Sequence, residues 1–362
     1  MLERLKSLFG RKAPVPIEPA VRPAPAGADA YEVYCTLRDV PVPTFAHTLH
    51  AHLDLSEPAI MEQLKQACAE ILSRGDGKMN RDKFEAMLHI QRAQHYVRLA
   101  VGPDAIPAMY DWAGEANGVL RTPSGDVTDT NGNALIMAAA GVKETDARFP
   151  VLPEAIARMR ATQALLAARG IDAAGYLPSL VSDREVMLRT RDEVIERARA
   201  LLLVALRADS VASNEPVPID ALLAKMPLAD DALSPQEKAF VEQEAPSNEA
   251  CAPFIWRYES LLVLEWALGL VDQLPYPDTG ADSAKVVATL IEMRGPQLRP
   301  AAEILDALDL HYRLHWHIRQ TRIKQGVEAV GVDADVVLER HRTLNWLVRF
   351  LHADWDDVDT PT

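Results

Sequence analysis

The sequence has little cysteine and no long hydrophobic run, and both absences narrow the class of protein. Only Cys35, Cys68 and Cys251 occur in 362 residues, at spacings that match no zinc motif. Such sparse usage is typical of a reducing compartment, so we expect a cytoplasmic protein. No stretch approaches the roughly 20 consecutive apolar residues of a membrane-spanning helix. The N-terminal LERLKSLFGRK also lacks the apolar length and cleavage pattern of a secretory signal.

Positive charge is scarce as well. Lys and Arg number 38 against 52 Asp and Glu, which gives a net charge of −14 and a pI near 5.2. General nucleic-acid binding is therefore not expected, because phosphate contacts require clustered Lys and Arg. Residues 301 to 350 differ from the rest, with seven basic residues, seven acidic residues and four of the ten histidines. Because this region is neutral within an acidic protein, an anion can bind to it.

The common cofactor motifs are missing too. The chain contains no GxxxxGK[ST] loop, no GxGxxG, no GxSxG and no HExxH. The segment from Asp129 to Asn133 superficially resembles a calcium loop, but its glycine spacing and late glutamate are absent. His47, His50 and His52 lie close together without an acid or thiol at a metal-ligand spacing, which favours solvated or capping histidines. We therefore assign no metal site, and the cofactor is unknown.

Three domains are expected. Residues 1–28 combine a basic amphipathic segment, 2–12, with a Pro-rich linker. The segment 2–12 is expected to be a tail without a role, because one short helix binds lipid only marginally. The alternative is that it makes peripheral contact with a membrane. Residues 29–145 form a small α+β domain, and residues 146–362 a larger all-α domain.

The periodicity of 29–145 predicts, in order, a strand Tyr31 to Leu37, a helix Glu57 to Ser73, strands Lys83 to Gln91 and Gln94 to Val101, a helix Asp104 to Ala116 and a strand Gly118 to Thr122. This βαββαβ order is that of a ferredoxin-like domain.

Helix signals dominate from residue 146 onward. Pro153 opens a helix that Gly170 can end. Capping boxes begin at Ser182, Thr190 and Ser234. The segment Pro253 to Leu270 is apolar almost all round and is predicted as one buried helix, although it includes three charged residues, Arg257, Glu259 and Glu265. Charges in such a helix imply a paired network. A last helix is expected from Ala334 to His352.

The stretch Arg299 to Arg322 is predicted as the central helix. One face carries Asp309 and Arg313 at the i,i+4 spacing that permits an ion pair. Another face begins apolar and then becomes cationic, with His311, His315, Arg319 and Arg322. Unpaired charges are costly in a protein interior, so carboxylates are expected opposite this face. Asp354 to Asp359 at the end of the sequence are candidates to close over it.

Several ordered pieces of the helical part resemble a known family. They read IARMRATQALLAARGI, LPSL, LRTRDEVIERARAL, LSPQEKAFV, FIWRYESLLVLEWALGL, LRPAAEILDALDLHYRLHWHIRQTR, VVLERHRTLNWL and WDDVDT. Together they are similar to the bacterial domain-of-unknown-function family 4272, over about Pro153 to Thr360. The resemblance implies a bacterial origin and brings no established activity. It also implies that the following residues lie on motif positions: Arg189, Glu193, Arg257, Glu259, Asp306, Asp309, Arg313, Trp316, Glu339, Arg340, His341, Asn345, Trp346, Trp355 and Asp357.

Two functions follow from these patterns. The first is a non-enzymatic protein-interaction module, of adaptor or toxin-antidote type, with a protein partner. The alternative is an enzyme or small-molecule binder with an anion or metal pocket lined by His311, His315, Arg319 and His341, which are the catalytic candidates. A third reading makes the same charges a structural salt-bridge network. The binding candidates are Arg257, Glu259, Asp309, Arg313, Arg322, Glu339, Arg340, Asn345, Trp355 and Asp357.

Overall fold

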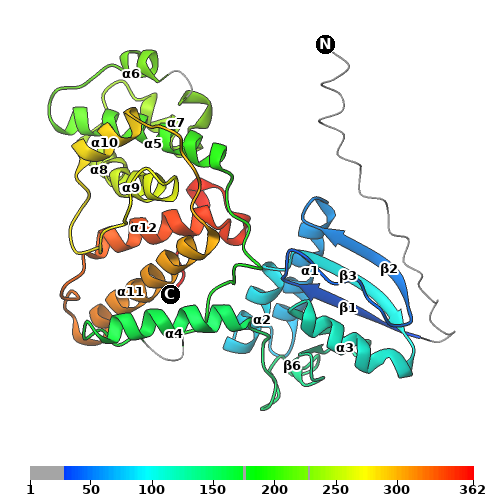
Figure 1. Ribbon diagram of the computed structural model, residues 1–362. Coiled ribbons are helices and arrows are strands. Elements are labelled where there is room, and N and C mark those ends of the chain that lie inside the picture. Colours follow the sequence, from blue (N-terminus) through cyan, green and yellow to red (C-terminus); the bar gives the residue numbers. More distant parts are fainter. Residues whose placement is uncertain (1–27, 174–176, 227–228) are drawn as a thin grey trace, which may run out of the picture. The chain divides into compact units, whose positions relative to one another are not determined.

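The computed structural model describes residues 28–173, 177–226 and 229–362. The chain divides into two compact units, Met1–Pro150 (unit 1) and Val151–Thr362 (unit 2). The basic segment 2–12, for which membrane contact was one expectation, lies outside the described residues. The two units together give an α+β protein, with an antiparallel sheet first and a series of helices after it (Figure 1).

Unit 1 is built on a six-stranded sheet in the order β2-β3-β1-β4-β5-β6. Every neighbouring pair is antiparallel. The strands are β1 (Asp29–Cys35), β2 (His47–Asp54), β3 (His95–Val101), β4 (Gly118–Arg121), β5 (Val127–Thr128) and β6 (Ala134–Ile136). β2 and β6 are the edge strands of this sheet, and β1 lies at its centre beside β3 and β4.

Helices cover both faces of the sheet. Alternate residues of a strand point to opposite faces, and β1 follows this rule: Val33 packs in a cluster with Met109 and Trp112 of α3 (Ile106–Glu115). Tyr34 packs in the other cluster, with residues of α1 (Ala59–Ser73) and α2 (Arg81–Gln91). A short 3₁₀ turn, η1 (Pro103–Ala105), leads into α3.

The predicted βαββαβ order is wrong in two places. Residues 83–91, predicted as a strand, belong to α2, because the Asn80 side chain accepts the Lys83 N–H and starts a helix. Burial of the Lys83 ammonium against the carbonyls of Leu72, Arg74 and Lys78 fixes that helix further. The histidine-rich segment after β1, which was not assigned to a strand, forms β2 against β3. The observed order is therefore ββααβαβββ.

Unit 2 is helical. Its helices are α4 (Pro153–Ala167), α5 (Arg191–Ala212), α6 (Ile219–Lys225), α7 (Pro235–Val241), α8 (Asn248–Ile255), α9 (Arg257–Ala267), α10 (Ser283–Ile291), α11 (Ala301–Gln325) and α12 (Ala334–Leu347), with 3₁₀ turns η2 (Asp230–Ala232), η3 (Phe350–His352) and η4 (Trp355–Asp357). The capping boxes at Thr190 and Ser234 begin α5 and α7, as predicted, whereas the one predicted at Ser182 begins a turn and no helix. The predicted helix Pro253 to Leu270 is broken at Trp256, and the last helix ends at Leu347 rather than His352.

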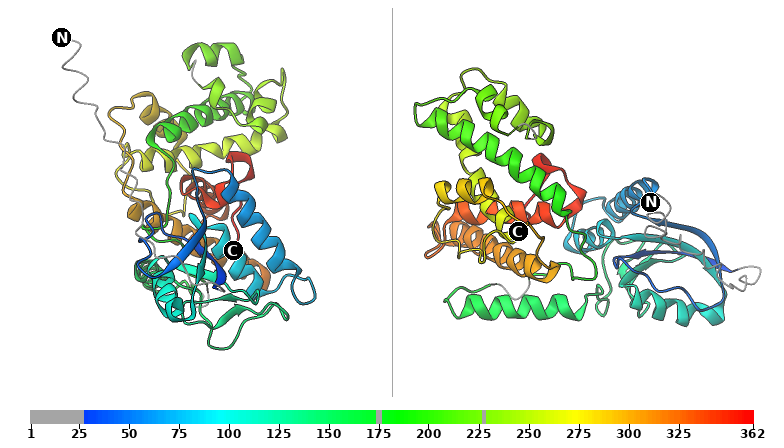
Figure 2. Two further views of the ribbon diagram at one scale, coloured as in Figure 1. Left: turned by 90° about the vertical axis from the view of Figure 1, so that its right-hand side faces the viewer. Right: turned by 45° about the horizontal axis from the view of Figure 1, so that its top comes forward.

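The long helices of unit 2 pack in succession. α4 packs on α11, α11 on α12, α12 on α9, and α9 on α5 (Figures 1 and 2). α9 lies in the middle of this series, and each of its residues from Arg257 to Ala267 is buried. Its leucines belong to the largest hydrophobic cluster of the unit. Because α9 is enclosed, its charged residues must find their partners inside the protein.

In the part of the chain that the structure describes, we find no helix with the length and apolar character needed to cross a membrane.

Candidate functional site

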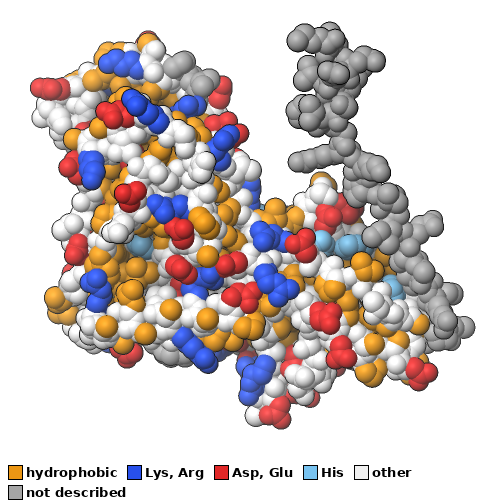
Figure 3. All heavy atoms as spheres, viewed as in Figure 1, with side chains coloured by type: hydrophobic (Ala, Val, Ile, Leu, Met, Phe, Trp, Pro, Cys, Tyr) orange, Lys and Arg blue, Asp and Glu red, His pale blue; other side chains and the backbone are white. Residues whose placement is uncertain are grey.

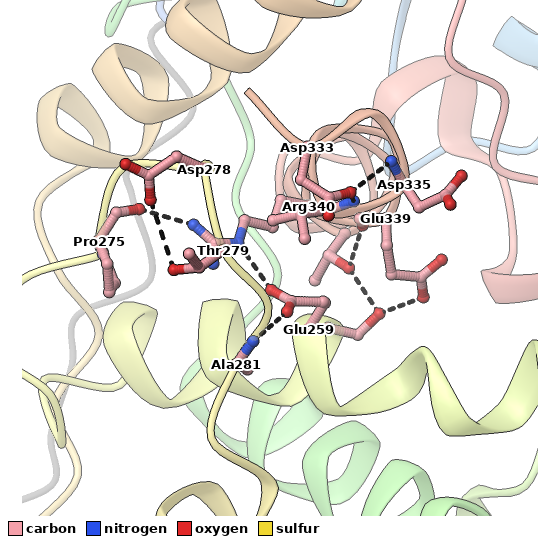
Figure 4. Close-up of polar contacts among 12 residues, drawn as sticks. Glu259, Pro275, Asp278, Thr279, Ala281, Asp333, Asp335, Glu339 and Arg340 are labelled. Atoms are coloured by element: carbon pink, nitrogen blue, oxygen red, sulfur yellow. Dashed lines mark hydrogen bonds and ion pairs between the residues drawn. The ribbon is translucent and has the colours of Figure 1, made fainter. Parts of the chain in front are cut away.

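The polar residues of α9 and α12 meet between the two helices. Glu259 of α9 and Arg340 of α12 form an ion pair with Nε and Oε2 2.9 Å apart, and both side chains are almost fully buried. The second Glu259 oxygen accepts the Ala281 N–H, and Arg340 donates to the Pro275 carbonyl at 2.6 Å (Figure 4). The pair therefore joins two helices to the segment between α9 and α10. Its donors and acceptors are directed toward other parts of the protein.

A second pair lies next to the first, two positions earlier on α9 and one position earlier on α12. Arg257 of α9 donates to Glu339 of α12, and the Ser260 hydroxyl donates to the same carboxylate oxygen. The Thr343 hydroxyl lies 2.9 Å from Ser260 Oγ. α9 and α12 are thus cross-linked by two ion pairs and a hydroxyl chain, an arrangement that fixes the position of one helix along the other.

The Asp309–Arg313 ion pair predicted from the i,i+4 spacing is present on α11. Its two contacts, Nε to Oδ2 and Nη2 to Oδ1, are both 3.0 Å. Arg313 also donates to the Pro178 carbonyl. The bidentate geometry is the strong form of this interaction, and both side chains are buried. This pair ties α11 to the segment before α5.

Three of the four catalytic candidates are neighbours in the core. Nδ1 of His315 and Nδ1 of His341 are 3.1 Å apart, so one ring must donate to the other. His311 donates to the Ala307 carbonyl, and its Nε2 has no partner among the described residues. Burial lowers the pKa of His311 and of His315 to about 4, and lowers the pKa of His341 well below its ordinary value. All three imidazoles are therefore neutral at pH 7.

The cationic residues proposed for an anion pocket have separate partners. Arg319 donates to the backbone oxygen of Thr362 at 2.9 Å, Arg322 forms a bidentate pair with Glu328, and Arg340 is held by Glu259. Among the described residues, no group of three or more His, Cys, Asp or Glu is arranged to hold a metal ion. A hollow of about 350 Å³ is lined by none of the candidates and lies against Leu268, Gly269, Gly295 and residues 297–300.

Trp355 occupies a cage of guanidinium groups, which we call the arginine cage. The Cζ atoms of Arg342, Arg197 and Arg257 lie 4.8, 5.0 and 5.6 Å from its ring. Trp346 contacts the same ring edge-on. Such cation–π contacts strengthen when they are desolvated, and Trp355 is only 4% exposed.

Two further predicted residues contact or belong to the segment that carries Trp355. Asn345 donates to the Asp359 carbonyl at 2.8 Å, and Asp357 is exposed.

The residues that complete the arginine cage were not predicted. Arg197 is buried and pairs with Glu237, which also belongs to the capping box of α7. Arg342 is half-buried, and its guanidinium lies 3.9 Å from the Glu339 carboxylate. A signal for Arg197 exists in the sequence, since helical spacing places it on the same face as Val194 and Leu201, which are both core residues. A charged residue on such an apolar stripe indicates a buried partner.

Glu265 is the one charged residue of α9 that neither ion pair uses. Its carboxyl group is fully buried, and neither oxygen has a hydrogen-bond partner among the described residues. Burial raises its pKa to about 8, so the group is protonated at neutral pH. A neutral carboxyl group is the form that an apolar core tolerates.

The connection between α11 and α12 exposes an apolar surface. Ile323, Val327 and Val330 are 70%, 53% and 92% exposed; we call these three residues the α11–α12 surface. Figure 3 shows hydrophobic side chains at the lower left of the molecule, where α11 ends and leads into α12 (Figure 1).

Fold and site together define a two-unit α+β protein whose helical unit is cross-linked by buried ion pairs. The model of the family described as Domain of unknown function (DUF4272) matches residues 158–358. More than half of the chain is covered, and the chain belongs to this family. No curated protein and no solved structure matches the chain.

Proposed function

We propose that this protein is a non-enzymatic protein-interaction module, of adaptor or toxin-antidote type, and that the α11–α12 surface binds its partner. One observation carries the proposal: three exposed aliphatic side chains, Ile323, Val327 and Val330, lie within eight residues of the chain where α11 ends and leads toward α12. Their exposure contrasts with the rest of α11 and α12, whose apolar residues largely face the core. Apolar side chains grouped on a surface mark interaction sites more often than single ones do.

The candidate polar residues form ion pairs and hydrogen bonds within unit 2, and this also supports an interaction role. Arg257, Glu259, Arg313 and Arg340 are all bound to other parts of unit 2. In this reading their task is to fix α9, α11 and α12 relative to one another. A rigid helix pair then presents the α11–α12 surface in one conformation, which lowers the entropic cost of binding.

Charge indicates the kind of partner. Arg319, Arg322 and Lys324 are exposed around the α11–α12 surface, and the acidic residue among them, Glu328, is paired with Arg322. The surface is thus locally basic within a chain of net charge −14. An amphipathic segment with an acidic rim fits it, because complementary charge guides association and apolar contacts at the centre provide affinity.

Substitution of one exposed isoleucine tests this proposal. Ile323→Asp should abolish recovery of the partner from cells of the source organism, since it places a charge at the centre of the contact. Ile291→Asp on α10 is the matched control, because Ile291 is 71% exposed and Ile323 is 70% exposed. Co-purification and mass spectrometry compare the two variants with wild type. Equal recovery of the same protein by all three would refute the α11–α12 surface as the binding site.

A further inference from the structure

Residues 353–362, the docked segment, lie across unit 2 in the manner of a bound peptide. Four side-chain donors reach their backbone oxygens: Arg189 to Ala353 at 2.9 Å, Arg342 to Trp355 at 2.6 Å, Asn345 to Asp359 at 2.8 Å and Arg319 to Thr362 at 2.9 Å. The Gln236 N–H donates to Asp356 at 2.9 Å. Fixed side-chain donors that bind the main chain of a docked segment are a usual basis of peptide recognition. Here the segment includes the 3₁₀ turn η4.

Two apolar side chains anchor this segment. Trp355 enters the arginine cage, and Val358, three residues further on, is 8% exposed in the same hydrophobic cluster. Large aromatic side chains in enclosed pockets are the typical anchors of protein interfaces. Of the four aspartates in the segment, Asp354 attracts Arg189, and Asp356 attracts Arg197 and Arg342.

The arginine cage does not depend on the acids of the docked segment. Glu237 of α7 holds Arg197, and Glu339 of α12 holds Arg257 and lies 3.9 Å from Arg342. The guanidinium groups are thus positioned by carboxylates of the helices themselves. The binding site therefore persists when the segment leaves.

Two features weaken the hold on the docked segment. Arg349, Leu351 and His352, just before it, have φ values of 52°, 52° and 55°, a left-handed conformation that is unfavourable for these residues. The indole N–H of Trp355 is buried without an acceptor in the described part of the chain. Release of the segment relieves both costs.

We propose that this groove is a peptide-binding site, that residues 353–362 occupy it in cis, and that an acidic segment of a partner protein with a tryptophan anchor displaces them. Arg319 borders both this site and the α11–α12 surface, but the test of the groove does not involve Ile323, Val327 or Val330. A protein with an acidic W-x-x-V segment is the partner that the groove fits.

The test measures binding of a fluorescein-labelled peptide, ADWDDVDTPT, to the full chain by fluorescence anisotropy. Trp355→Ala should bind it at least tenfold more tightly than wild type, because the variant removes the internal anchor and leaves the arginine cage free. Phe84→Ala, which removes a half-exposed aromatic side chain of unit 1, should bind like wild type. A peptide with alanine in place of tryptophan should lose at least tenfold in affinity for the Trp355→Ala variant.

The proposal is overturned if folded Trp355→Ala binds the peptide no more tightly than wild type, or if the alanine peptide binds equally well. Circular dichroism and a cooperative melt establish folding. If Trp355→Ala does not fold, Val358→Ala decides by the same comparison, with an expected gain of about threefold. A concentration-dependent wild-type dimer that Trp355→Ala abolishes would assign the groove to a second copy of this chain and so contradict a partner peptide.

Discussion

Replacement of Arg340 by methionine should lower the free energy of unfolding of unit 2 by about 3–5 kcal/mol, the usual penalty for breaking a buried ion pair from one side. The substitution leaves the Glu259 carboxylate buried with one backbone N–H as its remaining hydrogen-bond donor. It also leaves the Pro275 carbonyl without its donor. Urea denaturation followed by tryptophan fluorescence measures the loss, since five of the six tryptophans belong to unit 2.

Two comparisons separate the ion pair from general damage. Arg322→Met removes the same side chain from an exposed pair, in which Arg322 is 62% exposed, and should cost no more than about 1 kcal/mol. Glu259→Gln in the Arg340→Met background removes the stranded charge and should recover at least half of the loss. If Arg340→Met is as mild as Arg322→Met, the Glu259–Arg340 pair does not hold α9 to α12.

Unit 2 should lose stability as the pH falls from about 6.5 to about 4. The folded-state pKa of His311 is lowered to about 4 by burial, whereas an unfolded histidine keeps an ordinary value near 6.5. Between these values the unfolded state binds more protons than the folded state, so stability falls as the pH decreases. His311 alone contributes a loss of about 3 kcal/mol by pH 4, at about 1.4 kcal/mol per pKa unit. His341 adds to the loss, because its pKa is lowered in the same direction.

Urea denaturation at several pH values between 4 and 7 tests this dependence. For wild type, the free energy of unfolding should fall with decreasing pH at a rate that corresponds to the uptake of several protons on unfolding. For His311→Gln this uptake should be smaller by close to one proton, which lowers the slope by up to about 1.4 kcal/mol per pH unit. The amide retains a donor for the Ala307 carbonyl. The same slope in both proteins would mean that His311 is protonated equally in the folded and unfolded states.

Local signals predicted local structure well. The capping boxes at Thr190 and Ser234 marked the first residues of α5 and α7, and Pro153 marked the start of α4. The i,i+4 spacing of Asp309 and Arg313 predicted their ion pair, because helix geometry alone brings such residues together. Where two local signals competed, the prediction was wrong: apolar residues within 83–91 suggested a strand, while Asn80 already capped a helix there.

Contacts between distant segments were not predictable in detail. Charges within the segment Pro253 to Leu270 indicated a network of ion pairs. Periodicity, however, predicts only on which face of a helix a residue lies and does not identify its partner on another helix. The pairing of Glu259 with Arg340 depends on how α9 and α12 pack, and these residues are 81 positions apart. The arginine cage requires three helices, α5, α9 and α12, to meet at Trp355. Docking of the acidic segment onto the helices was expected, whereas its donors were not identified.

Site-specific photo-crosslinking tests the proposed function most directly. A photoreactive amino acid is placed at Val330, which is 92% exposed on the α11–α12 surface, or at Ile291 on α10, and cells of the source organism that produce each variant are irradiated. The proposal predicts one discrete heavier adduct from position 330, which mass spectrometry resolves into this chain and one partner, and no such adduct from position 291. Absence of an adduct at 330, or the same adducts from both positions, would contradict a partner-binding role for this surface.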